Sequence, residues 1–101
     1  MDMKIVKTQK NWNLHKRGYK VAFRFQRHIL PQSFSRIVEW LEANRGPKAI
    51  WSWDHENPNV QWTCEPGRSK RWQEAHPYFI GLKNEADVTA ILLSLNLNVE
   101  Q

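Results

Sequence analysis

Residues 19–26, YKVAFRFQ, alternate between side chains that avoid water and side chains that face it. One side of the extended chain carries the apolar residues Val21, Phe23 and Phe25. The other side carries Lys20, Ala22 and Arg24. A period of two is typical of a strand that buries one face only. The segment therefore predicts a sheet with one covered face and a basic outer face.

Two segments have the spacing of amphipathic helices, with apolar side chains at i, i+3, i+4 and i+7. The first follows Ser33, a candidate N-cap, and ends at Gly46. Its apolar positions are Phe34, Ile37, Val38 and Leu41. The second follows Asn84, with Asp87 three residues on in the place of a capping-box acid. Its apolar positions are Val88, Ile91, Leu92 and Leu95.

Further strands are predicted around these helices. Residues 49–54 and 60–64 form a hairpin joined by the turn residues HENPN, and residues 77–83 form another strand. Residues 4–7 add a short edge strand. The order of strands and helices indicates an α+β fold: a two-layer sandwich in which two helices cover one face of an antiparallel sheet of about four strands.

The whole chain, residues 1–101, is expected to form a single domain. Within it, residues 1–18 form either a basic N-terminal arm or the edge strand. The tail alternates at Leu95, Leu97 and Val99, and if it pairs with the sheet the layout approaches a ferredoxin-like arrangement. The second face of the sheet is left to water, to a partner or to another copy of the chain.

Three of the six tryptophans, Trp51, Trp53 and Trp62, lie in the predicted hairpin. Burying an aromatic side chain is worth roughly 2–3 kcal/mol. Because two apolar helix stripes need a matching sheet surface, we expect these rings in the core. The alternative is a stacking platform, since proteins that bind single-stranded nucleic acid place aromatic rings beside cations on a sheet.

The net charge of +5 comes entirely from the first third of the chain. Residues 1–30 hold eight Lys or Arg and one Asp, a net +7. Residues 31–64 hold three basic and four acidic groups. Residues 65–101 hold four basic and five acidic groups, so each of these two parts contributes −1. This asymmetry indicates an acidic partner, of which nucleic acid is the commonest. The alternative is a solvated basic edge that keeps the protein soluble.

Two segments without periodicity each place one tryptophan among cations, KNWNLHKR around Trp12 and GRSKRWQ around Trp72. Such a ring either pins its own loop or stacks on a base while the cations hold phosphate. The predicted contacts to nucleic acid or to an acidic protein are Trp12, Lys16, Arg17, Lys20, Arg24, Arg68, Lys70, Arg71 and Trp72.

The sequence has no motif with the spacing of a catalytic or metal site. Asp54, His55 and Glu56 are adjacent, so an extended chain would point them to opposite faces. No two histidines have the i, i+4 spacing of helical metal ligands. Cys64 is expected to be a small buried thiol. We therefore expect no enzymatic activity, cofactor or metal. An alternative is a small-molecule site between sheet and helices, with Asp54, His55 and His76 as its polar groups.

The only cysteine fits a reducing compartment, and the N-terminus lacks the apolar core of a signal peptide. No apolar run reaches the length of a membrane span. The sequence therefore predicts a soluble, intracellular protein of the cytoplasm.

The segment PYFIGLKNEADVTAILLSLNL, the helix end EWLEANRGP and the Trp-rich hairpin together resemble a loose group of small, uncharacterised bacteriophage proteins. These pair a Trp-rich hairpin with a closing strand-turn-helix of the type Tyr-Phe-x-Phe-x-x-Glu-x-Asp-Ala. The matching residues are Tyr78, Phe79, Glu85 and Asp87. Ile80 and Val88 depart from the pattern. The resemblance implies a viral origin, and so the host-cell cytoplasm, but no activity.

Taken together, the sequence predicts a small non-enzymatic binding module, an accessory protein of phage type. Its basic N-terminal third and residues 65–76 would bind an acidic macromolecule, either nucleic acid or a host protein. One alternative is a protein specific for single-stranded nucleic acid. The other is a structural homo-oligomer in which a second copy covers the open face of the sheet.

Overall fold

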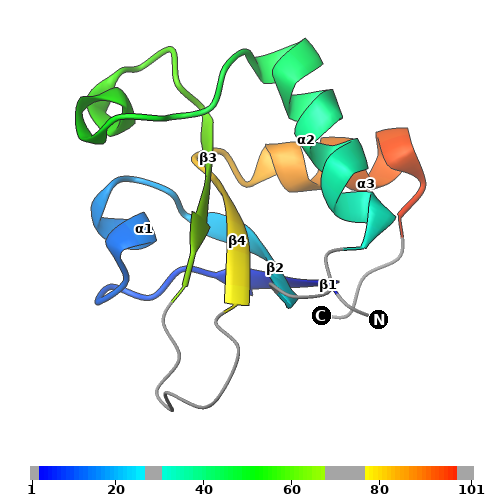
Figure 1. Ribbon diagram of the computed structural model, residues 1–101, viewed down its shortest axis with the longest axis horizontal. Coiled ribbons are helices and arrows are strands. Elements are labelled where there is room, and N and C mark those ends of the chain that lie inside the picture. Colours follow the sequence, from blue (N-terminus) through cyan, green and yellow to red (C-terminus); the bar gives the residue numbers. More distant parts are fainter. Residues whose placement is uncertain (1–2, 27–30, 68–76, 98–101) are drawn as a thin grey trace.

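The computed structural model describes residues 3–26, 31–67 and 77–97 and contains a four-stranded antiparallel sheet (Figure 1). In chain order the elements are β1 (Met3–Lys7), α1 (Asn13–Lys16), β2 (Val21–Gln26), α2 (Gln32–Arg45), the 3-10 turn η1 (Ser52–Glu56), β3 (Trp62–Pro66), β4 (Pro77–Leu82) and α3 (Ala86–Leu95). None of the helices in these ranges is both long enough and apolar enough to span a bilayer. The predicted α+β fold is confirmed.

The main core lies between the sheet and the helices α2 and α3, which cover the same face (Figure 1). Val21, Phe23 and Phe25 of β2 point into it and are at most 4% exposed, as their alternation predicts. Strands β1, β4 and β3 and the two helices contribute the other buried residues, which are Met3, Ile37, Leu41, Trp62, Ile80, Leu82, Val88 and Ile91. This core fixes which face of each strand is turned away from the helices.

The strands are arranged in the order β1-β2-β4-β3. From β2 onward the chain runs strand, helix, strand, strand, helix, like the first five elements of a ferredoxin-like arrangement. β1 pairs with β2 at the edge where that arrangement has its last strand. Leu95 is the last residue of α3, as its helical spacing predicts, so a closing strand of the tail could not begin there. Val99 lies outside the described residues, and the ferredoxin-like arrangement stays a prediction.

Helix α2 begins earlier than its capping signal indicates. Ser33 lies inside the helix, and Pro31 occupies the N-cap position, where its carbonyl accepts a hydrogen bond from the N–H of Phe34. The prediction that Ser33 caps the helix is therefore wrong, because proline, with no N–H to leave unpaired, already starts it. The predicted end is confirmed: Gly46 has a φ of 82°, which glycine adopts without strain.

The N-cap position of α3 is Glu85, which makes no capping bond with its side chain. Asn84, one residue earlier, accepts a hydrogen bond at 3.0 Å from the N–H of Ala86, the first residue of the helix. Asp87 does not complete a capping box. One of its carboxylate oxygens instead accepts two hydrogen bonds from the Arg45 guanidinium, at 2.9 and 3.0 Å. This ion pair raises the pKa of Arg45 and joins the end of α2 to the start of α3. It also explains why Asp87, only 4% exposed, can be buried.

The three tryptophans of the predicted hairpin do not share one environment. Trp62 is fully buried, as predicted, and its indole N–H donates to the carbonyl of Gly46 at 2.9 Å. Trp51 and Trp53 are 58% and 67% exposed, so the prediction that they lie in the core is wrong.

The prediction of a strand at residues 49–54 is also wrong, because this segment leads into the turn η1. The Asp54 carboxylate accepts hydrogen bonds from the backbone N–H groups of Ile50 and Trp51, at 2.9 and 2.8 Å. These local bonds use donors that a strand would give to its neighbour. Because the segment is not a strand, Trp51 and Trp53 do not point into the core and their rings are exposed.

We expect the Trp62→Phe variant to lose about 2 kcal/mol of unfolding free energy, because it leaves the Gly46 carbonyl without its donor and opens a small cavity. The matched exposed variant, Trp53→Phe, should change by less than about 0.5 kcal/mol. Urea unfolding followed by circular dichroism measures both. Equal losses in the two variants would contradict the buried position of Trp62.

Candidate functional site

The face of the sheet turned away from α2 and α3 is covered in part by α1 (Figure 1). A second, smaller core forms there from Leu14, Tyr19, Ala22 and Phe79. Gly81 of β4 makes room for this packing, since a Cβ at that position would lie 2.8 Å from a methyl group of Leu14. The helix-free face, as we call the side of the sheet without α2 and α3, is thus closed near α1 and open beyond it.

The position of α1 depends on how this short helix ends. Gly18 has a φ of 96°, and its N–H donates to the carbonyl of His15 at 3.0 Å. The N–H of Tyr19 donates to the carbonyl of Leu14, also at 3.0 Å. This pair of bonds is a Schellman motif, and the side chains of Leu14 and Tyr19 pack together as such motifs favour. Gly18 is the sequence signal for α1, a helix too short to be detected by periodicity.

A row of four side chains runs across this face, from its exposed part into the second core. The strand register pairs Lys4 with Arg24, Arg24 with Phe79, and Phe79 with Glu65. Cross-strand partners point to the same side of a sheet, so the four lie next to one another. The row runs from two exposed cations on β1 and β2 to a buried aromatic ring on β4 and a half-buried carboxylate on β3.

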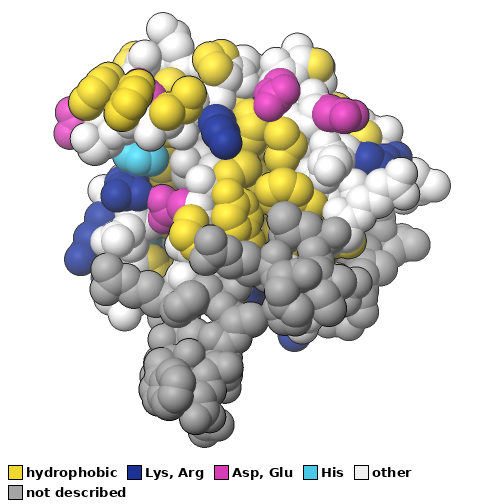
Figure 2. Space-filling model, in the orientation of Figure 1, with side chains coloured by type: hydrophobic (Ala, Val, Ile, Leu, Met, Phe, Trp, Pro, Cys, Tyr) yellow, Lys and Arg dark blue, Asp and Glu magenta, His cyan; other side chains and the backbone are white. Residues whose placement is uncertain are grey.

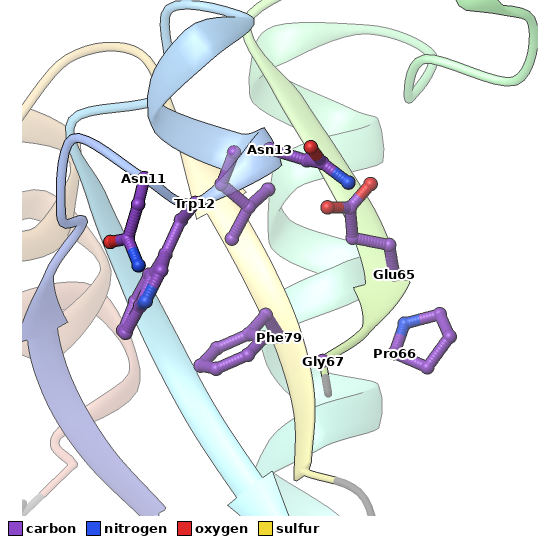
Figure 3. A pocket seen from close by; sticks show the side chains of 8 residues that line it. Asn11, Trp12, Asn13, Glu65, Pro66, Gly67 and Phe79 are labelled. Carbon is purple, nitrogen blue, oxygen red and sulfur yellow. The ribbon is translucent and has the colours of Figure 1, made fainter. Parts of the chain in front are cut away.

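A pocket of about 380 Å³ lies beside this row, within the size range of ligand sites (Figure 3). Trp12 and Phe79 form an aromatic wall, with ring centroids 5.5 Å apart and planes inclined by 39°. Asn11, Asn13 and Glu65 bring polar side chains to the same pocket, as Figure 3 shows. The lining therefore combines flat apolar surface with hydrogen-bonding groups.

One of the residues that line the pocket, Glu65, takes part in an ion pair. The Arg17 guanidinium, just after α1, donates a hydrogen bond of 2.7 Å to the carboxylate of Glu65 on β3. Burial raises the pKa of Glu65, and the Arg17 charge and hydrogen bond act in the opposite direction. Arg17 was predicted as a phosphate contact, but its first role in the structure is to hold α1 against β3.

The other predicted contacts that the structure describes lie on or beside the helix-free face. Trp12 lines the pocket and Arg24 belongs to the row. Lys20, directly before β2, and Lys16, at the end of α1, are exposed. The predicted contacts that lie outside the described residues are Arg68, Lys70, Arg71 and Trp72.

Sequence reasoning misses Lys4, Asn11 and Asn13, and on β4 and β3 it misses Phe79 and Glu65. Phe79 lies in the predicted strand 77–83, whose alternation is too weak to show which side chains face away from the helices. Glu65 lies one residue beyond the predicted strand 60–64, in a segment expected to be a loop. The place of Phe79 and Glu65 follows only from the pairing of β4 with β2, where the stronger alternation decides.

The groups considered for chemistry have structural partners. Asp54 binds two backbone N–H groups, which lower its pKa. His55 shares a 2.7 Å hydrogen bond with the Tyr19 hydroxyl, so it faces the second core rather than a space under α2 and α3. Burial raises the pKa of the Cys64 thiol to about 11, and the thiol is protonated at neutral pH. Within the part of the chain that the structure describes, no cluster of His, Cys, Asp or Glu could hold a metal ion. His76 lies outside that part.

Comparison with models of protein families, with curated proteins and with solved structures finds no match. The resemblance to small bacteriophage proteins stays a prediction, and the function has to be argued from the geometry of the site.

The burial of the Tyr19 hydroxyl gives a prediction for alkaline pH. Burial, with a smaller effect of the Glu65 charge, raises the pKa of Tyr19 from 10.0 to about 12. The folded state thus favours the neutral phenol. The neutral Tyr19 hydroxyl contributes fully to folding stability below pH 10, and this contribution is lost as the pH rises through about 12.

Ultraviolet absorbance of tyrosinate, measured during titration of the wild type and of Tyr19→Phe, tests this. We expect the two curves to differ by one ionisation at about pH 12. A difference centred at pH 10, the ordinary pKa of tyrosine, would contradict the buried hydroxyl.

Proposed function

We propose that this protein is a small non-enzymatic binding module that takes single-stranded nucleic acid on the helix-free face of its sheet. The observation that carries the proposal is the juxtaposition of Arg24 with Phe79 in the strand register, next to the Trp12 ring. Cations and aromatic rings on one face of an antiparallel sheet are the combination that binds backbone phosphates and unstacked bases.

The pocket supports the aromatic half of the proposal. A nucleobase is a flat ring with hydrogen-bonding groups along its edge. The pocket offers a matching surface, with the rings of Trp12 and Phe79 on its wall and the amides of Asn11 and Asn13 in its lining. Trp12 is partly exposed, so its ring can meet a base without the chain unfolding. One stacked base contributes roughly 1–3 kcal/mol.

Exposed cations support the electrostatic half. Lys16, Lys20 and Arg24 are all exposed, and no carboxylate among the described residues lies within ion-pair distance of any of them. Their charges are therefore available to phosphate groups, which hold single strands largely by counterion release. Arg17 differs, because Glu65 already neutralises it.

Nucleic acid fits this face better than the other partners that the sequence leaves open. An acidic protein would use the cations but has no general need for a flat pocket lined by amides. A second copy of the chain would have to pack over α1 and bury the exposed charge of Arg24, which is costly without a paired carboxylate. The charged row thus favours a phosphate-bearing partner.

Arg24→Glu and Lys48→Glu make the same change in net charge at different places. Lys48 is exposed. Burial raises the pKa of Cys64, and the charge of Lys48 tends to lower it. Cys64 packs against the main core, so Lys48 lies near the side of the sheet that carries the helices. We expect Arg24→Glu to weaken binding of a single-stranded oligonucleotide about 10-fold or more. The salt slope, which is the slope of the logarithm of the binding constant against the logarithm of the salt concentration, should fall in magnitude by about 1. Lys48→Glu should change the affinity by less than about 3-fold.

Fluorescence anisotropy of a labelled oligonucleotide of about 16 nucleotides, at several salt concentrations, measures both effects. If the two variants weaken binding equally, only net charge matters and the proposed face is wrong. If the wild type does not bind at low salt, or binds an acidic protein without salt dependence, the proposed function is wrong.

A further inference from the structure

Beyond the pocket, the described surface carries a second group of exposed rings. Trp51 and Trp53 stack on each other with centroids 5.4 Å apart and planes inclined by only 11°. Ile50, beside them, is 69% exposed. Figure 2 shows hydrophobic side chains gathered over this part of the molecule, where Figure 1 draws the green turn near α1. Adjoining large apolar side chains left in water mark an interaction site more often than chance.

The turn that carries these rings is held in place at several points. The Asp54 carboxylate binds the N–H groups of Ile50 and Trp51. The Lys83 ammonium donates to the carbonyls of His55 and Asn57, at 2.8 and 3.2 Å. The rings are therefore presented by a backbone that is already ordered, so that little conformational entropy remains to be lost when a ligand binds.

The turn is also joined to the helix-free face. His55 hydrogen-bonds the hydroxyl of Tyr19 at 2.7 Å, and their rings meet edge to face. Tyr19 belongs to the second core with Leu14 of α1. The turn and α1 consequently lie on the same side of the sheet, as Figure 1 shows. Arg17 connects the two places, because it pairs with Glu65 in the lining of the pocket and lies near enough to His55 of the turn to contribute, after burial, to its lowered pKa.

The size and charge of this surface select its occupant. A stable protein interface uses about 20–30 residues on each side, far more than these three exposed side chains. A single flat ring, in contrast, can extend the existing stack. Lys83 stands at the base of the turn, where its ammonium donates to the carbonyls of His55 and Asn57. Asp54 and Glu56 carry the opposite charge, and the two backbone N–H groups bound by Asp54 keep its carboxylate ionised by lowering its pKa. The turn therefore suits the flat face of a base and not a phosphate group.

We propose that Trp51 and Trp53 form a second stacking platform, which holds an unpaired base of the same single-stranded nucleic acid that occupies the pocket. This inference rests on the proposed function and adds to it a contact made through base stacking rather than through phosphate. It assigns a role to two rings whose exposure the fold itself does not require.

The double variant Trp51→Ala/Trp53→Ala tests the platform, with Trp51→Phe/Trp53→Phe as the control that keeps flat rings. The ligand is the labelled oligonucleotide of about 16 nucleotides. We expect the alanine variant to bind about 10-fold more weakly with an unchanged salt slope, because it loses stacking and no phosphate contact. The phenylalanine variant should stay within about 3-fold of the wild type. Both variants should remain folded by circular dichroism, since the two rings lie outside the cores.

The outcomes separate the two proposals. If the wild type binds the oligonucleotide and the alanine variant binds it equally well, the platform is wrong and the proposed function stands. A reduced salt slope in the alanine variant would also overturn the platform, because the loss would then involve phosphate. A wild-type dimer in sedimentation that the alanine variant loses would show a second copy as the occupant and overturn it too. If the wild type binds no oligonucleotide, both proposals fail.

Discussion

Helices α2 and α3 bury one face of the sheet, and most of the surface follows from that burial. Strand β2 places Val21, Phe23 and Phe25 against the helices, and the strict alternation of a strand then sends Arg24 to the other side. A slip of one residue in the register would bring Arg24 into the core, which no partner there could stabilise. The cations of the helix-free face are thus set by the same pattern that forms the core.

The pocket depends on a further condition, the packing of α1 on the helix-free face. Gly18 ends α1 in a conformation that other residues adopt with strain, and Gly81 leaves space for Leu14. The ion pair with Glu65, made by the C-cap residue Arg17, ties the end of α1 to β3. With α1 in place, Trp12 is brought over Phe79 and the aromatic wall of the pocket is complete. Two glycines and one ion pair therefore position α1, and with it the ring of its N-cap residue Trp12.

Sequence reasoning finds those parts of the structure in which local preference and burial agree. The alternation in β2 and the apolar stripes of α2 and α3 identify the strand, the helices and the main core. Asp87 departs from its predicted local role because a long-range partner, Arg45, binds its carboxylate. Helix α1 has only four residues, which is too short for a helical repeat of apolar side chains to be detected.

The segment from Ile50 to Glu56 shows most clearly why pattern alone is insufficient. Its alternating tryptophans match a strand, but the Asp54 carboxylate closes a turn with local hydrogen bonds and takes Trp51 and Trp53 out of the sheet. The choice between core and surface for these rings was decided by one carboxylate. Of the candidate site, the sequence predicts Trp12 and the cations other than Lys4. Phe79 and Glu65 require the strand pairing, which no single segment encodes.

The most direct measurement is an amide and indole nuclear magnetic resonance titration with an unlabelled single-stranded oligonucleotide. We predict that the indole signals of Trp12, Trp51 and Trp53 and the amide signals of Arg24 and Phe79 shift together. The buried indole of Trp62, bound to the Gly46 carbonyl, should stay unchanged. Shifts confined to α2 and α3, or no shifts at all, would contradict binding on the helix-free face.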